Sequence, residues 1–247
     1  MLDRRVLRNE VLLVLGVSLG ASGVYSLVTI IARLTANRPL AQQTATLNAS
    51  RAPERPYLDL TLQLLDVLFA IVPALLAVHL LRRDPGVDIG LDRSRPVFDV
   101  GSGAILAAVI GIPGIGLYVA ARHLGINAQV VPAALPHIWW AVPVLILAAA
   151  QNAILEEVVV VGYLVTRLRE LGWRLWTTVA ASAVLRGSYH LYQGIGAFIG
   201  NAVMGVVFAL FFLRTRRVLP LVVAHTILDI VSFVGYTLLK DRLEWLR

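Results

Sequence analysis

The sequence predicts an all-α membrane protein, a polytopic bundle of about seven transmembrane helices. Of its 247 residues, 58% are hydrophobic, and the mean hydropathy is +0.76. Apolar runs of about twenty residues recur along the chain, which is the length that a helix needs to cross a bilayer. A soluble domain of this size carries far more charge than the 15% found here. The chain has no cysteine, which excludes disulfides and cysteine-ligated metals.

The apolar runs give the predicted spans in order. The first run follows a basic start and, at about 24 residues, is too long for the core of a signal peptide, so we expect an uncleaved first span. The fourth run contains Pro143, which predicts either a kink or an interfacial segment with the letters PHIWW ahead of a shorter span. Trp139 and Trp140 suit an interface belt. The spans cover residues 11–33, 58–81, 98–121, 136–166, 175–192, 195–213 and 218–239.

The distribution of basic residues predicts the orientation. The net charge of +7 includes 22 cations, of which only Lys240 is a lysine. A basic protein can bind nucleic acid, but these arginines lie in short connections between spans, so we expect no nucleic-acid partner. Segments on the side of the N-terminus hold 13 cations, segments on the other side hold 8, and Arg186 lies inside a span. This bias predicts a cytoplasmic N-terminus, and heavy Arg, Ala and Val use with almost no Lys favours a bacterial inner membrane.

Ionisable residues inside the predicted spans are the unusual feature of this sequence. Each costs about 2.5–3.5 kcal/mol on insertion scales, so such residues usually face a bundle interior or a water-filled cavity. With a rise of about 1.5 Å per residue, acids and imidazoles of three spans fall at one depth near the bilayer middle. Asp66 and His79 lie alone in the second span, where we expect structural roles. The C-terminal group consists of Glu156, Glu157, Arg186, His190, His225 and Asp229.

Helical spacing predicts which of these side chains point the same way. His225 and Asp229 are four residues apart, and so are Arg186 and His190, which places each pair on one helix face. Glu156 and Glu157 are adjacent, about 100° apart on a helix. We therefore expect one of the two glutamates to face a cavity and the other to face a neighbouring helix.

A carboxylate beside an imidazole in a dry pocket is a device for activating water. Desolvation raises the pKa of a carboxyl group toward neutrality, which makes its carboxylate a better general base. A second imidazole can donate to a developing oxyanion. The sequence has no Gly-rich phosphate loop, no HExxH and no G-x-S-x-G motif, so hydrolysis by activated water is the interpretation that we favour.

Two alternatives remain open from the residues alone. Zinc is the rival to a metal-free site, with His190, His225, Asp229 and Glu156 as a plausible ligand set. A proton-coupled transporter would also use carboxylates and histidines, but transporters usually show inverted repeats or broken helices, and neither is visible in the sequence.

The motifs resemble those of the CAAX protease and bacteriocin-processing family of intramembrane proteases, also called the Abi family. The family signature is EExxxR, then FxxxH, then HxxxN or HxxxD. The corresponding stretches here are EEVVVV from Glu156, RGSYH ending at His190, and HTILD from His225. The resemblance covers roughly residues 136–239, and these three motifs occur in the family's order.

The resemblance implies a role for each matched residue. Glu156 is expected to be the general base that activates water, and His190 is expected to help hold that water. His225 and Asp229 are expected to stabilise and orient the oxyanion, with Glu157 in support. The site would open toward the cytoplasm. Family members are often labelled metalloendopeptidases; we favour a glutamate mechanism with no cofactor, with zinc as the alternative.

Two positions depart from the family pattern. The motif arginine is replaced by Val161, and the phenylalanine of FxxxH is replaced by Arg186. One hypothesis explains both changes: the cation has moved to the neighbouring helix, where Arg186 pairs with Glu157. A buried carboxylate without such a partner would be expected to take up a proton.

The resemblance also suggests how the chain is divided. We expect N-terminal transmembrane helices over residues 1–135, a catalytic bundle over 136–239 and a C-terminal tail over 240–247, with a polar loop at 34–57. The expected partners are the lipid bilayer and a membrane-associated peptide or protein substrate, which an endopeptidase would cleave. The alternative from a different class is a non-catalytic binding or immunity protein on the same scaffold.

Overall fold

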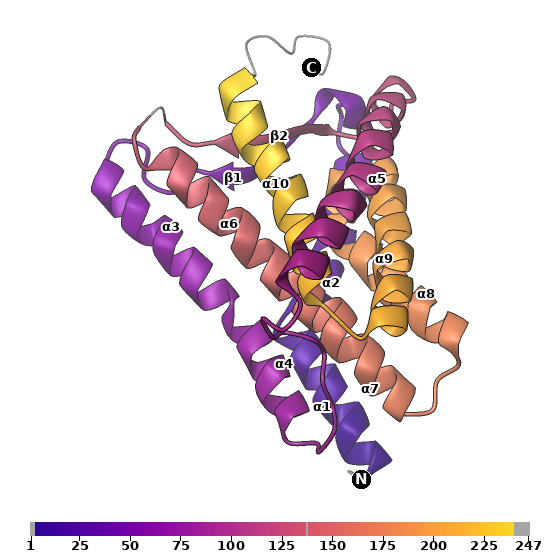
Figure 1. Cartoon of the computed structure of the whole chain (residues 1–247). Coiled ribbons are helices and arrows are strands. Elements are labelled where there is room, and N and C mark those ends of the chain that lie inside the picture. The colour runs from indigo at the N-terminus through magenta and orange to yellow at the C-terminus, as the bar shows by residue number, and fades with distance from the viewer. Residues whose placement is uncertain (1–2, 137, 240–247) are drawn as a thin grey trace.

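The computed structural model describes residues 3–136 and 138–239, so the predicted tail lies outside the described residues. Its helices form a bundle, with the N-terminus at one end and a small sheet near the other (Figure 1). The helices are α1 (Arg4–Gly16), α2 (Leu19–Leu34), α3 (Pro56–Ala70), α4 (Val72–Arg82), α5 (Pro96–His123), α6 (Ala141–Glu156), α7 (Leu164–Glu170), α8 (Leu175–His190), α9 (Ile195–Thr215) and α10 (Leu219–Leu239).

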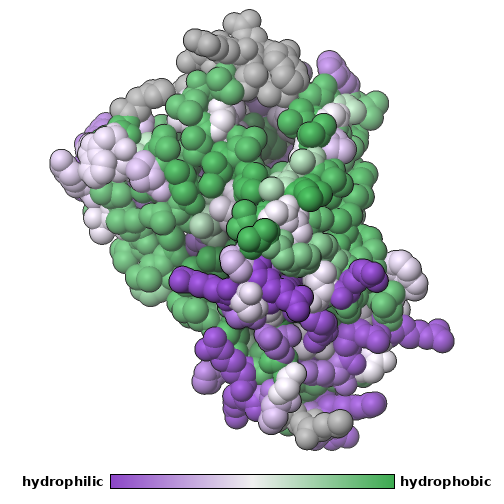
Figure 2. Space-filling model, in the orientation of Figure 1, coloured by the Kyte–Doolittle hydropathy of each residue, from purple (hydrophilic) through white to green (hydrophobic). Residues whose placement is uncertain are grey.

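The predicted polytopic helical bundle is confirmed. Among the described residues, five helical segments are long and apolar enough to cross a membrane, and a sixth is obtained if α1 and α2, which are bent by 53°, count as one span. The predicted span at 175–192 corresponds to α8, which has only 16 residues. Hydrophobic side chains cover most of the visible face of the helices, and hydrophilic ones gather at the end that carries the N-terminus (Figure 2).

A two-stranded parallel sheet lies where a polar loop was expected. Strand β1 (Thr44–Ala49) follows α2, and β2 (Gln129–Ala134) follows α5. The register pairs Ala45 with Val130 and Asn48 with Ala133. Each strand is short and finds its partner far away along the chain, so local sequence patterns do not reveal it.

The fourth predicted span differs from expectation at its start. Helix α6 begins at Ala141, so Pro143 lies in the first turn, where proline is tolerated, and the kink expected there is wrong. Trp139 is 74% exposed, in keeping with an interface residue, but Trp140 is 1% exposed and packs with Ala141 and Val144. The irregular part of the span lies further on, at Glu157–Tyr163.

A buried arginine ties together the end of the bundle near the N-terminus. The Arg167 guanidinium is 1% exposed and donates to Glu10 (3.0 Å), to Glu170 (2.8 Å) and to Asp84. Tyr163 donates its hydroxyl proton to the same Glu10 oxygen at 2.9 Å. These bonds join α1, the α4–α5 connection and α7 around one cation.

A second arginine holds the connection between α4 and α5 against the α9–α10 turn. Arg217 donates to Asp99 at 2.7 and 2.8 Å and to Asp92 at 3.2 Å. Ser94 and Arg217 hold the pKa of the Asp92 carboxyl well below its usual value of 3.8. Asp99 and Asp92 in turn raise the pKa of Arg217 above its usual value.

This arrangement predicts an acid dependence of stability. A carboxyl whose pKa is lowered by folding stabilises the fold above its unfolded pKa and loses that contribution as the pH falls. We therefore expect the melting temperature to drop below about pH 4, and Asp92→Asn to reduce that drop. Thermal unfolding in detergent between pH 5 and pH 3 measures it, with Glu54→Gln, at an exposed position, as the control. An acid dependence unchanged by Asp92→Asn would contradict the expectation.

Candidate active site

Three helical segments bring the candidate residues together. Glu156 and Glu157 lie at the junction of α6 and the turn η2 (Glu157–Tyr163). Arg186 and His190 come from α8, and His225 comes from α10. The Glu156 Oε2 atom lies 3.7 Å from His190 Nε2 and 4.0 Å from His225 Nδ1. The expected convergence of the three motifs is therefore confirmed.

The glutamate pair sits where the helix widens. The segment η2 is a π-helical turn, in which the Leu164 N–H donates to Val159 O, five residues earlier. Arg186 of α8 reaches both glutamates, at 2.6 Å from Glu157 and 3.5 Å from Glu156. They differ in access: the side chain of Glu156 is 11% exposed and that of Glu157 is 0% exposed.

The ion pair expected between Arg186 and Glu157 is confirmed. Arg186 Nη2 donates to Glu157 Oε1 at 2.6 Å, and Nη1 lies 3.5 Å from Glu156 Oε2. Both partners of the shorter pair are fully buried, as is Val161, which stands in place of the motif arginine. The guanidinium also lies over the Phe208 ring at 5.4 Å. The cation of the family motif has thus been replaced by one from α8.

A glycine of α9 makes room for the Arg186 side chain. Gly205 of α9 faces α8, and a Cβ atom there would come within 2.8 Å of Ala183 Cα and 3.3 Å of Arg186 Cδ. The close approach of α8 and α9 therefore depends on glycine at this position, which lets the guanidinium stem pass between the helices.

Within the described chain, the hydrogen bonds and ion pairs of Glu156 all use one carboxylate oxygen. Tyr189 donates its hydroxyl proton to Oε2 at 2.8 Å, and the contacts with Arg186 and His190 use the same oxygen. Gln193 lies with its Nε2 atom 3.3 Å from His190 Nδ1. Because an amide N–H can only donate, His190 Nδ1 accepts this bond. The imidazole proton therefore lies on Nε2, which points at Glu156. That Nε2 atom is buried and has no hydrogen-bond partner in the described chain.

His225 lies between two carboxylates. Its Nδ1 atom donates to Glu157 Oε1 at 2.7 Å, and its Nε2 atom is 3.6 Å from Asp229 Oδ1. Asn152 of α6 donates to Asp229 Oδ2 at 3.4 Å. The bond to Glu157 sets the position of the ring and leaves the Nε2 side directed at Asp229 and the space beside it.

The residues do not fit a metal ion well. Within the described residues, the group with donor atoms close enough for one ion is Glu156, Glu157 and His225, so His190 and Asp229 of the proposed zinc set fall outside it. Carboxylate and imidazole are suitable zinc ligands in type. However, the Arg186 guanidinium contacts both carboxylates. A divalent ion there would face a fixed positive charge at close range, where a low dielectric makes the repulsion strong.

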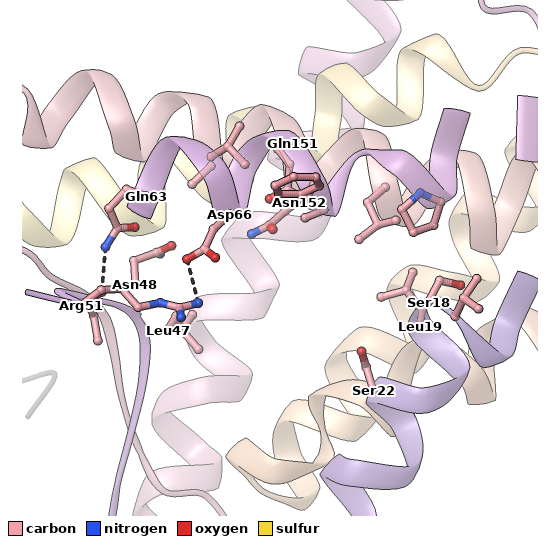
Figure 3. Close-up of a pocket in the computed structure, with 18 of the residues that line it drawn as sticks. Ser18, Leu19, Ser22, Leu47, Asn48, Arg51, Gln63, Asp66, Gln151 and Asn152 are labelled. Carbon is pink, nitrogen blue, oxygen red and sulfur yellow. Dashed lines mark hydrogen bonds and ion pairs between the residues drawn. The ribbon is translucent and has the colours of Figure 1, made fainter. Parts of the chain in front are cut away.

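A cavity of about 650 Å³ reaches α6 from the end of the bundle that carries the sheet (Figure 3). It lies between β1, α3, α6 and the break between α1 and α2. Asn152, which donates to Asp229, lines it, whereas the candidate glutamates, histidines and Asp229 are not among its lining residues in the described chain. Asp66, for which we expected a structural role, lines it too and pairs with Arg51 at 2.7 Å.

Sequence reasoning missed two residues of the site. Tyr189 lies beside a motif histidine, and only its hydroxyl contact with Glu156 marks it. Asn152 lies four residues before Glu156, on the same helix face. A polar residue at that spacing in an otherwise apolar run was a usable signal.

Comparison with known families agrees with the motifs. Residues 138–231 match a family model described as type II CAAX prenyl endopeptidase Rce1-like. The matched segment contains both glutamates, Arg186, both site histidines and Asp229. The resemblance to the CAAX protease family is therefore confirmed over this part of the chain, and the match supports a membrane protein of the CAAX protease type. Searches of curated proteins and of solved structures found no match.

Proposed function

Because residues 138–231 are similar to type II CAAX prenyl endopeptidases, we propose that this protein is an intramembrane endopeptidase. It hydrolyses a peptide bond of a membrane-associated protein or peptide with water activated by Glu156. The observation that carries the proposal is the contrast between the two glutamates. Glu157 is fully buried and paired with Arg186 and His225, whereas Glu156 retains access and faces the buried His190 Nε2.

The geometry suggests the following steps. A water held between Glu156 and His190 Nε2–H, which are too far apart for a direct bond, gives its proton to the carboxylate. The hydroxide attacks the scissile carbonyl, and the developing oxyanion accepts a hydrogen bond from Nε2–H of His225, which acts as an imidazolium because its Nδ1–H is bonded to Glu157. The carboxyl group of Glu156 then returns the proton to the leaving amine. The peptide bond breaks, and water supplies both the hydroxyl and the proton.

Three side chains hold this arrangement in place. Tyr189 donates to Glu156 Oε2, which orients the carboxylate. Glu157 accepts from His225 Nδ1 and keeps that ring directed at the oxyanion position. Arg186 compensates the charge of the buried Glu157 without a metal ion. Arg186 gives Glu157 a cationic partner in place of the motif arginine. The absence of that arginine therefore no longer favours a non-catalytic binding protein.

Peptide cleavage tests this function and its independence of metal. The purified full chain in liposomes is incubated with a peptide library, and mass spectrometry identifies the products. We expect cleavage that is unchanged after treatment with a chelator and not increased by added zinc, because the Arg186 guanidinium beside both carboxylates repels a divalent ion. Activity lost with chelator and restored by zinc would overturn the metal-free mechanism. Failure to cleave any library member would favour the non-catalytic alternative.

A further inference from the structure

The free edge of β1 borders the cavity beside the candidate active site. β1 pairs with β2 along one edge, so its other edge carries backbone groups without a strand partner in the described chain. Gln129 N–H donates to Gln43 O at 2.8 Å, which shows that Gln43 points toward β2. Backbone groups alternate in direction along a strand. Those of Thr44, Thr46 and Asn48 therefore point away from β2.

This edge faces the helices that surround the cavity. The Thr44 carbonyl accepts a bond from Arg33 of α2 at 3.1 Å. At the other end of the strand, the Ala49 carbonyl, which by the same alternation points toward β2, accepts one from Gln63 of α3 at 2.9 Å. Of the residues that point away from β2, Thr46 is exposed and Asn48 lines the cavity. These two residues carry backbone N–H and C=O groups that have no strand partner in the described chain.

The cavity extends from β1 to α6, the helix that carries Glu156 at its end (Figure 3). Its volume of about 650 Å³ lies within the range of pockets that bind ligands. Its wall on α6 includes Asn152, which donates to Asp229, and Leu155, which precedes Glu156. A chain bound along β1 would therefore enter a cavity whose wall includes Asn152, the hydrogen-bond partner of Asp229.

The lining also indicates the chemistry of the occupant. Its ionisable side chains are Arg51 and Asp66, which pair with one another at 2.7 Å. The remaining polar lining residues are neutral, among them Asn48, Gln63 and Ser22. A pocket whose charges already neutralise each other favours uncharged side chains, because a charged one would lose its hydration without gaining a partner.

We propose that an extended, uncharged segment of the substrate peptide binds to the free edge of β1 as an added strand, with its side chains in this cavity. The inference rests on the proposed peptidase function. Strand addition gives affinity through main-chain hydrogen bonds and specificity through pockets for alternate side chains. It also holds the substrate backbone extended, so that its carbonyls are not engaged in helical bonds and can be attacked.

The chain offers a direct test because it contains no cysteine. A single cysteine is introduced by Thr46→Cys, with Thr177→Cys, exposed at the start of α8, as the matched control. The probe is an eight-residue peptide of Ala, Val and Ser with one cysteine activated as a thionitrobenzoate disulfide. The protein thiolate displaces thionitrobenzoate and forms a mixed disulfide with the peptide. For each variant, the rate with the peptide is divided by the rate of the same variant with the activated disulfide of mercaptoethanol. This ratio corrects for differences in thiol reactivity between the two positions.

We expect the normalised rate at Thr46→Cys to exceed that at Thr177→Cys by roughly tenfold, the effect of a few hydrogen bonds. Methylating alternate backbone nitrogens of the peptide removes the donors that strand addition needs, and should lower the rate to that of the control. Replacing two alanines of the peptide by aspartate should lower it as well. Equal rates at both positions, or rates insensitive to N-methylation, would overturn the proposal.

The same protein separates this inference from the proposed function. The exchange is also measured in the Glu156→Gln background, which binds without cleaving. Cleavage by the wild type without any preference at Thr46→Cys would reject strand addition and leave the peptidase standing. Preference at Thr46→Cys in a protein that cleaves no library member would keep the peptide site and reject the peptidase.

Discussion

Glu156→Gln is expected to reduce peptide hydrolysis by at least about 10²–10⁴-fold, the usual contribution of a general base. Glutamine has the shape of glutamate and can still accept the bonds from Tyr189 and Arg186. It cannot take a proton from water. Initial cleavage rates in liposomes measure the effect, and a melting curve in detergent should change little, because Glu156 keeps partial exposure.

Two control variants make this result specific. Glu54→Gln changes an exposed loop carboxylate and should leave the rate unchanged. Glu157→Gln should lower the melting temperature as well as the rate, since Glu157 is fully buried between Arg186 and His225. If Glu156→Gln retained full activity while Glu157→Gln lost it, the roles of the two glutamates would be reversed.

Arg186→Met is expected to have the largest effect on stability, a loss of about 3–5 kcal/mol in the free energy of unfolding. The reason is the carboxylate left behind. Glu157 has no exposed surface, and its Oε2 atom already has no hydrogen-bond partner in the described chain. Without the guanidinium, a buried negative charge would remain beside Glu156, the base of the proposed mechanism. Unfolding by added denaturing detergent measures the change.

The control for this variant is Arg214→Met, which removes an exposed arginine and should shift the melting temperature little. A second experiment exchanges the positions. Arg186→Phe combined with Val161→Arg restores the family pattern and should recover part of the stability lost in Arg186→Phe alone. A double variant no more stable than the single one would show that the space around η2 cannot accept a cation at residue 161.

The membrane bundle and the main candidate residues of the site could be predicted from the amino-acid sequence. Apolar runs as long as a bilayer is thick leave few alternatives to spanning helices, because backbone groups in lipid must be satisfied within the chain. Buried ionisable residues are too costly to be frequent by accident, so Glu156, His190 and His225 could be identified from their position alone. The paired departures at Val161 and Arg186 even predicted an ion pair between helices.

How these groups meet follows from tertiary packing. Arg186 reaches both glutamates from α8, and the contact of Tyr189 with Glu156 depends on where α8 lies beside the end of α6. The β1–β2 pairing joins segments far apart in the chain, and its short strands are stabilised by one another. Helical spacing and hydropathy are local properties that sequence carries directly, whereas a turn type, a crossing of helices and a strand register follow from non-local packing.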